Sequence, residues 1–379
     1  MSGAAKSDVL IVGAGVIGLS LARELNRLGA GRITLLEKGR PGRESSFAAA
    51  GMLAPQAEAD APDDFFRFCR ASAQEYPEFA AALYEETGVD IEYDDAGTLY
   101  LGFTEEDLSE LARRYEWQSA SGLRVEHLSG ADTRKLEPFV SPESVGSLYF
   151  PDDRQVENRK LIEALLRYCG LNGIEIVPEA QAKEIQEAPG HDVLVSCEDG
   201  RTFSGSKVVI TSGAWSSKVR LAAGSLPALK PVRGQMVSFS VAKRLFSKVI
   251  YSPRGYIVPR RFGRILAGST TEDSGFDNRT TESGIEKVLG TAHEISPSLA
   301  NLKITDKWSG LRPYAEDGHP VIGRVTGANR VFIGAGHYRN GILLAPLTAR
   351  ILADLVLNGR DSEFIRLFSG YGAAKRQAV

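Results

Sequence analysis

Hydrophobic and polar positions near the start of the chain follow the pattern of a strand, a helix and a second strand. An apolar run covers residues 8–12, an amphipathic stretch covers 19–28, and a second apolar run covers 33–36. Short apolar runs are typical of buried strands, whereas apolar positions three or four residues apart indicate a helix. The pattern therefore predicts a β-α-β unit, which builds parallel sheets in α/β proteins.

The rest of the chain mixes the same two periodicities. Helices are predicted over residues 62–88, 105–120, 156–169, 282–294 and 342–357. Strands are predicted over residues 91–103, 174–177, 207–215, 236–241, 255–259, 264–269 and 330–333. Strands that alternate with helices, the pattern of a doubly wound parallel sheet, lie at both ends and in the middle of the chain. A second, mostly antiparallel unit is therefore expected to be inserted in two pieces.

Three glycines stand between the first strand and the helix that follows it. Gly13, Gly15 and Gly18 have G-x-G-x-x-G spacing, which allows a tight turn and the close approach of backbone N–H groups to a pyrophosphate. Glu37 ends the second strand, where a carboxylate accepts hydrogen bonds from ribose hydroxyls and repels a 2′-phosphate. The pattern favours FAD or NAD over NADP, and the alternative is a chance glycine cluster in a turn.

A second glycine-rich loop covers residues 334–341 and precedes the predicted helix 342–357. The N–H groups at a helix start carry partial positive charge, which stabilises negative charge on a reduced flavin. Cofactor contacts are expected from His337, Tyr338, Arg339, Asn340, Gly341, Ile342 and Leu343. The alternative is an ordinary turn between a strand and a helix.

Composition limits the classes of function that remain. The chain has 379 residues, which favours two domains, and 45 basic against 48 acidic residues give a net charge of −3. This balance does not suggest nucleic-acid binding. Three cysteines lack C-x-x-C spacing and the histidines lack ligand spacing, so no metal is expected.

The cytoplasm is the expected location. The first strand begins at residue 8, which leaves no room for a signal peptide ahead of it. The most apolar late segment, residues 342–357, is interrupted by Arg350 and Asp354. It is therefore expected to be an amphipathic helix rather than a stable membrane insertion.

Several motifs together resemble the D-amino-acid-oxidase-like flavoprotein family, and within it the branch that oxidises glycine. They are the glycine fingerprint and residues 45–52, 208–215, 310–313, 317–323 and 336–346. The resemblance covers almost the full length and is most specific over residues 308–346. It implies an α/β fold, with an FAD-binding Rossmann-like domain and an inserted α+β substrate domain on a mostly antiparallel sheet. The FAD-binding domain is expected over residues 1–80, 150–218 and 309–379, and the substrate domain over 81–149 and 219–308.

The resemblance also assigns residues to the cofactor. FAD is expected to be bound without a covalent link, because no cysteine follows residue 197. Besides the residues already named, it implies FAD contacts from Val16, Ile17, Lys38, Ser45, Ser46, Ala50, Gly51, Met52 and Ala182.

The substrate is expected to be a small amino acid held by its carboxylate. The planar fork of an arginine suits a carboxylate, and the resemblance makes Arg312 the principal anchor and Arg339 a second contact. Tyr256 is expected to lie over the flavin and close the carboxylate site. The implied reaction oxidises glycine, sarcosine, D-alanine or D-proline to an imine and then a 2-oxo acid, with ammonia and H2O2 as products. Glycine imine would supply the thiazole of thiamine.

Two other functions stay open on the sequence alone. One is a D-amino-acid or D-proline dehydrogenase that passes electrons to an acceptor other than oxygen. The other is a binding or assembly protein with a structural flavin. The resemblance also implies a homo-oligomer, a tetramer.

Overall fold

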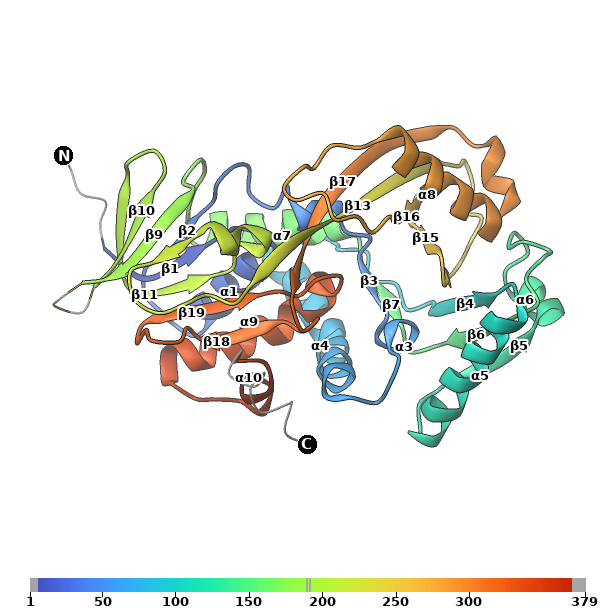
Figure 1. Cartoon of the computed structure of the whole chain (residues 1–379), viewed down its shortest axis with the longest axis horizontal. Helices are drawn as coiled ribbons and strands as arrows, with labels where there is room; N and C mark the ends of the chain where they lie inside the picture. Colours follow the sequence, from blue (N-terminus) through green and yellow to red (C-terminus); the bar gives the residue numbers. More distant parts are fainter. Residues whose placement is uncertain (1–5, 189, 191, 370–379) are drawn as a thin grey trace.

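Strand β1 (Ser7–Val12) lies inside the first sheet and runs parallel to both of its neighbours, β2 (Ile33–Leu36) and β11 (Thr202–Ile210). The computed structural model describes residues 6–188, 190 and 192–369, and within them this sheet has nine strands (Figure 1). The other strands are β8 (Glu175–Val177), β9 (Ala182–Glu187), β10 (Val193–Cys197), β12 (Arg220–Leu221), β18 (Val321–Arg324) and β19 (Val331–Ala335). The centre of the sheet is parallel, as the β-α-β pattern predicts, and β9–β11 add an antiparallel meander.

Long helices pack with this sheet around one hydrophobic core. They are α1 (Val16–Arg27), α4 (Asp64–Thr87), α7 (Asn158–Leu171) and α9 (Gly341–Asn358), with α10 (Glu363–Phe368) beyond them. Helix α9 is long and apolar enough to cross a membrane, but 72% of it is buried inside the protein. It is therefore a core helix, and its polar residue Arg350 lies on the exposed side and pairs with Glu75.

The second sheet is mostly antiparallel and carries helix α8 (Glu282–Ile295) on one face (Figure 1). Its strands, in spatial order, are β17 (Ile304–Ala315), β13 (Leu229–Ser240), β16 (Arg264–Gly268), β15 (Gly255–Pro259), β14 (Val249–Ser252), β4 (Thr98–Gly102), β6 (Gly146–Phe150) and β5 (Glu126–Ser129). Within the described part of this sheet, only β14 and β4 pair in parallel. Two further helices, α5 (Glu105–Ala120) and α6 (Gly130–Leu136), lie at its far end. The predicted fold class, a parallel-centred sheet with a mostly antiparallel partner, is confirmed.

Strands β13 and β17 join the two halves of the molecule (Figure 1). They pair over almost their whole length, with Val232 opposite Arg312 and Gly234 opposite Gly310. Leu229 and Ala315 at one end belong to a hydrophobic core that also contains residues of the first sheet. The two strands therefore carry side chains of the second sheet to the edge of the first.

Some predicted elements differ from the observed ones. Of the strand predicted over residues 91–103, only β4 forms, because Asp90 and Asp94 accept hydrogen bonds from the N–H groups of Glu92 and Ala96 in turns, and Gly97 has a positive φ. Strand β13 begins at Leu229 rather than at residue 236, and β17 was not predicted. The prediction also omitted short elements: α2 (Ser45–Ala48), β3 (Met52–Leu53), α3 (Pro55–Glu58), β7 (Arg154–Gln155), η1 (Gly213–Lys218), η2 (Pro297–Asn301), and β5, α6, β6, β12, β14, β18 and α10.

Candidate active site

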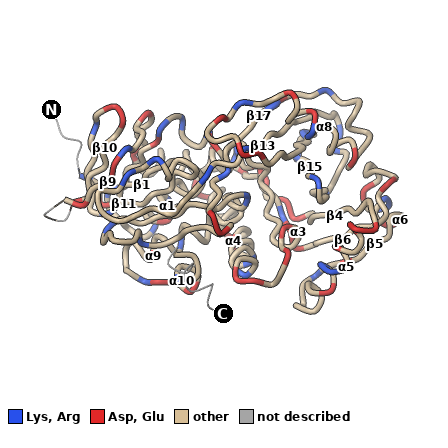
Figure 2. The backbone as a smooth tube through the Cα atoms, in the orientation of Figure 1, with Lys and Arg blue, Asp and Glu red and all other residues tan. Residues whose placement is uncertain are grey.

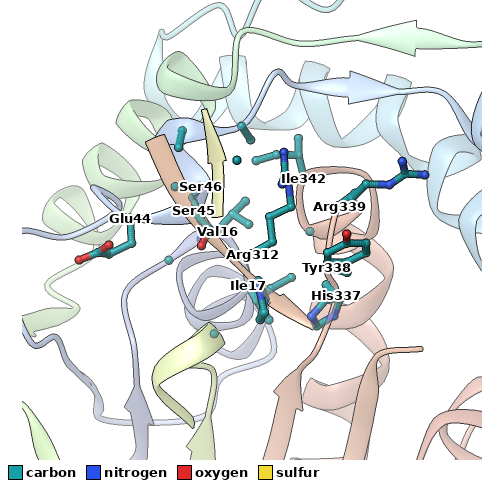
Figure 3. Close-up of a pocket in the computed structure, with 18 of the residues that line it drawn as sticks. Val16, Ile17, Glu44, Ser45, Ser46, Arg312, His337, Tyr338, Arg339 and Ile342 are labelled. Carbon is teal, nitrogen blue, oxygen red and sulfur yellow. Dashed lines mark hydrogen bonds between the residues drawn. The ribbon is translucent and has the colours of Figure 1, made fainter. Parts of the chain in front are cut away.

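One long pocket runs from the glycine turn after β1 to the second sheet (Figure 3). Its lining includes Gly13 and Glu37 from the first sheet, and Tyr256 and Arg312 from the second. A β-α-β turn that opens onto a ligand pocket is the arrangement of dinucleotide-binding proteins.

Most of the residues expected from the sequence line this pocket. They are Gly13, Gly15, Val16, Ile17, Glu37, Lys38, Ser45, Ser46, Ala50, Gly51, Met52, Ala182, Tyr256, Arg312, His337, Tyr338, Arg339, Gly341 and Ile342. Three expected residues do not line it. A β-carbon on Gly18 would lie 2.0 Å from the carbonyl oxygen of Gly13, so this glycine serves the packing of α1. Leu343 is buried in the core, and Asn340 is the N-cap of α9.

The glycine turn presents backbone to the pocket. Gly13 has a φ of 109°, and a β-carbon there would lie 2.7 Å from the carbonyl oxygen of Thr211. Gly15 is the N-cap of α1 and provides no capping side chain. Val16 N donates to Ser46 Oγ at 3.0 Å, which ties the turn to the small-residue segment. The start of α1 thus offers an anion-binding position.

Glu37 is buried at the end of β2, with 7% of its surface exposed. Its carboxylate accepts hydrogen bonds from Ala14 N at 2.9 Å and Gly39 N at 3.0 Å. Each carboxylate oxygen has a second lone pair, so these bonds fix the group while it still accepts from a ligand hydroxyl. Beside it, Lys38 pairs with Glu44 and lies 3.9 Å from the ring centre of Trp215.

Replacing Glu37 with glutamine is expected to weaken FAD retention without changing substrate preference. The amide removes the charge and one acceptor oxygen, and a charge-assisted hydrogen bond contributes ~1.5–3 kcal/mol. We expect the dissociation constant of FAD to rise about tenfold or more. Equilibrium dialysis of the released flavin measures it, and an unchanged constant would show that another residue holds the ribose.

The small-residue segment 45–52 is fixed by groups from distant parts of the chain. Ser45 Oγ donates to the carbonyl oxygen of Leu311, and Trp308 Nε1 donates to that of Ala48 at 3.0 Å. Arg260 donates to the carbonyl oxygen of Ala50 at 2.6 Å. A β-carbon on Gly51 would lie 2.1 Å from the carbonyl oxygen of Val156, so only glycine fits here. The segment is therefore a rigid wall of the pocket.

The second glycine loop leads into α9 at the same pocket. Asn340 makes no capping hydrogen bond, so the first N–H groups of α9 have no side-chain acceptor there. His337 is buried, and burial lowers its pKa to about 3, so the imidazole is neutral at physiological pH. Its Nε2 lies 3.1 Å from Thr348 Oγ1. Tyr338 has a φ of 47° and donates its N–H to the carbonyl oxygen of Pro313 at 2.9 Å.

Arg312 extends from β17 into the pocket. Its guanidinium donates to Ser269 Oγ at 2.6 Å and to the carbonyl oxygen of Thr270 at 3.1 Å. Gly234 on β13 makes room for it, since a β-carbon there would lie 2.1 Å from Arg312 Nη2. These neutral acceptors orient the fork and leave its charge available for an anion.

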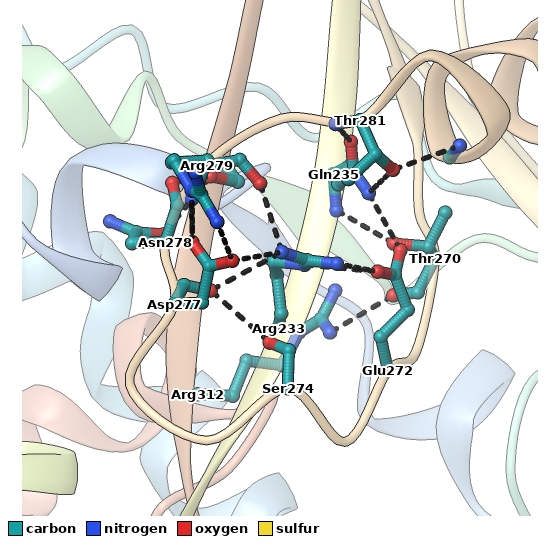
Figure 4. Close-up of polar contacts among 12 residues, drawn as sticks. Arg233, Gln235, Thr270, Glu272, Ser274, Asp277, Asn278, Arg279, Thr281 and Arg312 are labelled. Carbon is teal, nitrogen blue, oxygen red and sulfur yellow. Dashed lines mark hydrogen bonds and ion pairs between the residues drawn. The ribbon is translucent and has the colours of Figure 1, made fainter.

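A polar network behind Arg312 fixes its acceptors (Figure 4). Gln235 N donates to Thr270 Oγ1 at 2.9 Å, and Gln235 Nε2 donates to Glu272 Oε1 at 2.8 Å. Arg233 donates from Nε to Glu272 Oε2 at 2.9 Å. The loop after β16 is thereby attached to β13, which keeps the two acceptors of Arg312 in place.

Tyr256 and Arg339 line the same pocket but have different partners. The Tyr256 ring stacks on Tyr251, with ring centres 5.9 Å apart, and its hydroxyl lies 3.8 Å from Met236 Sδ. Arg339 Nη1 lies 3.5 Å from the Tyr251 hydroxyl, and Nη2 lies 3.6 Å from Glu58 Oε2. Glu58 and Tyr251 raise the pKa of Arg339.

Several lining residues were not expected from the sequence. They include Arg43, Glu58, Thr211, Lys218, Gly234, Met236, Tyr251, Ser269 and Thr271. Most belong to β13, to β14, to the loop after β16 or to the segments after β2 and β11, and apart from Thr211, which lies in the motif of residues 208–215, no motif marks them. Glu58 closely follows the small-residue segment 45–52 that the sequence had singled out.

Basic and acidic positions are interspersed over the described part of the chain. Lys and Arg alternate with Asp and Glu along both halves of the backbone in Figure 2. Within residues 6–188, 190 and 192–369, no three His, Cys, Asp or Glu side chains are placed to hold a metal ion. The long pocket is therefore the candidate active site.

Comparisons with known proteins agree with this geometry. The family described as FAD dependent oxidoreductase (DAO) matches residues 8–355. The chain is 34% identical to a glycine oxidase of Bacillus licheniformis, over 98% of each protein. It is also 34% identical to the bifunctional protein ThiO/ThiG of Synechocystis, over 96% of this chain and 53% of that protein. A crystal structure of glycine oxidase from Geobacillus kaustophilus matches with a TM-score of 0.89 and 32% identity, over 95% of this chain and 96% of that one. The chain therefore belongs to the DAO family of FAD-dependent oxidoreductases.

FAD, the cofactor of this family, fits the residues of the pocket. The turn at Gly13 has no space for a β-carbon, the N-cap residues of α1 and α9 make no side-chain hydrogen bond to their helices, and Glu37 lies at the expected end of β2. The turn and the start of α1 would hold a pyrophosphate, the start of α9 a flavin edge, and Glu37 a ribose.

When the protein is denatured, FAD is expected to dissociate from the polypeptide as an intact molecule. All three cysteines, Cys69, Cys169 and Cys197, are buried, and none lines the pocket. Acid or heat should release all of the yellow colour as FAD, which chromatography of the supernatant measures. Flavin that stays with the precipitated chain would contradict a non-covalent site.

Proposed function

We propose that the protein is an FAD-dependent oxidase of glycine and related small amines such as sarcosine, D-alanine and D-proline. In the balanced reaction, glycine, O2 and water give glyoxylate, ammonia and H2O2. The observation that carries the proposal is Arg312, a guanidinium that lines the pocket and is held by neutral acceptors. The similarity to glycine oxidases over 98% of the chain supports it.

The residues of the pocket have distinct parts in this reaction. Arg312 binds the substrate carboxylate with its fork, and Tyr256 closes the site over the bound amino acid. Met236 and the stacked rings of Tyr251 and Tyr256 form an apolar wall that excludes water and favours the uncharged form of the substrate amine. Bound FAD supplies the two-electron acceptor that O2 later reoxidises. The chain's contribution is therefore alignment in a shielded pocket.

Further parts of the proposal rest on the family resemblance. The imine product would serve the thiazole of thiamine, which the match to a protein named ThiO/ThiG supports. Residues 1–80, 150–218 and 309–379 would form the FAD-binding domain, and 81–149 and 219–308 the substrate domain. We also propose a cytoplasmic homotetramer. Tyr256 keeps its proposed contact to the substrate, and Arg339 and the other pocket-lining residues keep their proposed contacts to FAD.

Anaerobic reduction of the bound flavin tests the proposed function. Glycine, sarcosine, D-alanine and D-proline are mixed one by one with the oxygen-free holoenzyme, and bleaching is followed at the flavin absorption maximum. We expect rapid bleaching by at least glycine or sarcosine, and rapid recovery when O2 is admitted. A flavin that none of the four reduces would contradict the proposal, and reoxidation by quinones but not by O2 would identify a dehydrogenase.

A further inference from the structure

We propose that Glu58 determines specificity by neutralising Arg339, so that the pocket accepts amines with one carboxylate and excludes those with two. The inference rests on the proposed function in one respect, since it takes Arg312 as the anchor of the substrate carboxylate. It gives Arg339 a different role from the second carboxylate contact expected from the sequence.

The first observation is that Arg339 already forms an ion pair within the protein. Its Nη2 lies 3.6 Å from Glu58 Oε2, and its Nη1 lies 3.5 Å from the Tyr251 hydroxyl. The Glu58 side chain is only 11% exposed, so its carboxylate is largely shielded from water, whereas the Arg339 side chain is 44% exposed. A guanidinium and a carboxylate this close present almost no net charge to a ligand in the pocket.

The second observation is that the backbone leading to Glu58 is fixed and that the carboxylate oxygen facing Arg339 accepts no hydrogen bond. It ends helix α3, whose first turn is fixed by the buried Asp153 carboxylate, which accepts from Gln56 N at 3.0 Å and Ala57 N at 3.1 Å. Glu58 Oε2 is buried without a hydrogen-bond partner among the described residues. Since Glu58 lines the pocket, its carboxylate would meet any second anionic group that entered beside Arg339.

The third observation is the contrast with Arg312. Its acceptors are a hydroxyl and a backbone carbonyl, and no carboxylate of the described chain forms an ion pair with it. Met236, Tyr256 and Tyr251 also line the pocket, with Tyr256 contacting Met236 and Tyr251 contacting Arg339. Of the two arginines, Arg312 thus has no carboxylate partner in the described part of the chain, whereas Arg339 is paired with one.

A matched pair of substrates measures this difference. Sarcosine and iminodiacetate share an N-carboxymethyl group, but iminodiacetate carries a second carboxylate in place of a hydrogen on the methyl group. We expect the wild-type holoenzyme to prefer sarcosine in kcat/KM. In Glu58→Gln, Arg339 is free to bind the second carboxylate. The ratio of kcat/KM for iminodiacetate to kcat/KM for sarcosine should therefore rise by about tenfold or more.

The double variant Glu58→Gln/Arg339→Gln should lose this shift, because the gain depends on the released guanidinium. Glu75→Gln is the control, since it removes the same charge from an ion pair with Arg350 on the helical surface. This control should leave the ratio of the kcat/KM values for the two substrates unchanged. An equal shift in Glu75→Gln, or a shift that persists in the double variant, would overturn the proposal.

Binding of acetate and malonate, followed by calorimetry on the holoenzyme, supplies a measurement without turnover. Wild type should bind malonate no more tightly than acetate, and Glu58→Gln should bind malonate about tenfold more tightly relative to acetate. Tighter malonate binding by wild type would overturn the inference even if the variant failed to fold. A protein that no amine reduces, but whose anion preference changes in this way, would contradict the proposed function alone.

Discussion

Arg312→Ala is expected to raise the KM for glycine by about 30-fold or more. Glycine offers only an amine and a carboxylate, so its recognition depends on the charge-assisted pair with this guanidinium. Removing one member of such a pair costs ~2–5 kcal/mol, and each 1.4 kcal/mol corresponds to a factor of ten. The fork is oriented by Ser269 and Thr270 in the space that Gly234 leaves. Steady-state kinetics with glycine measures the effect.

Three further measurements separate this role from a general loss of structure. Arg312→Lys should recover only part of the affinity, because a point-like ammonium does not reproduce two parallel hydrogen bonds. FAD content should stay near that of wild type, and the slow oxidation of an amine without a carboxylate should change little. A KM within a factor of about three of wild type, below ~0.7 kcal/mol, would place the anchor elsewhere.

Arg260→Met is expected to destabilise the holoenzyme by ~3 kcal/mol and to loosen the flavin wall. Arg260 is 4% exposed and donates to the carbonyl oxygens of Ala50 and Val156 and to Gln155 Oε1. Its Nε also lies 3.4 Å from a carboxylate oxygen of Glu157. The methionine fills similar space but leaves these buried acceptors without a donor, which costs more than the hydrogen bonds themselves contribute. Urea unfolding followed by flavin and tryptophan fluorescence measures the change.

The neighbouring Arg261→Met is the matched control. Arg261 pairs with Asp90 at the surface, where both side chains are about half exposed, and such pairs contribute ~0–1 kcal/mol. It should therefore shift the unfolding midpoint little and leave FAD affinity unchanged. Equal effects of the two variants would show that Arg260 does not hold the segment that contains Ala50.

Much of the fold, and many residues that line the pocket, could be predicted from local sequence. The β-α-β pattern located β1 and β2, and helix α5 was predicted with its observed bounds, because apolar periodicity reports which face of an element is buried. Strand β17 was missed because Gly310 and Pro313 interrupt a strand pattern that only pairing with β13 completes. The same pairing places Gly234 beside the Arg312 guanidinium, which no spacing along the chain indicates.

The sequence by itself determined the glycine turn, the acidic end of β2 and the class of ligand that they accept. These features are local, because a turn and the helix that follows it need only consecutive residues. The tertiary structure alone decided which charges stay available in the pocket. Arg312 and Arg339 look alike in the sequence, yet only Arg339 meets a carboxylate, which comes from Glu58, 281 positions earlier in the chain. Such pairing depends on how two distant segments are packed, and therefore on the whole fold.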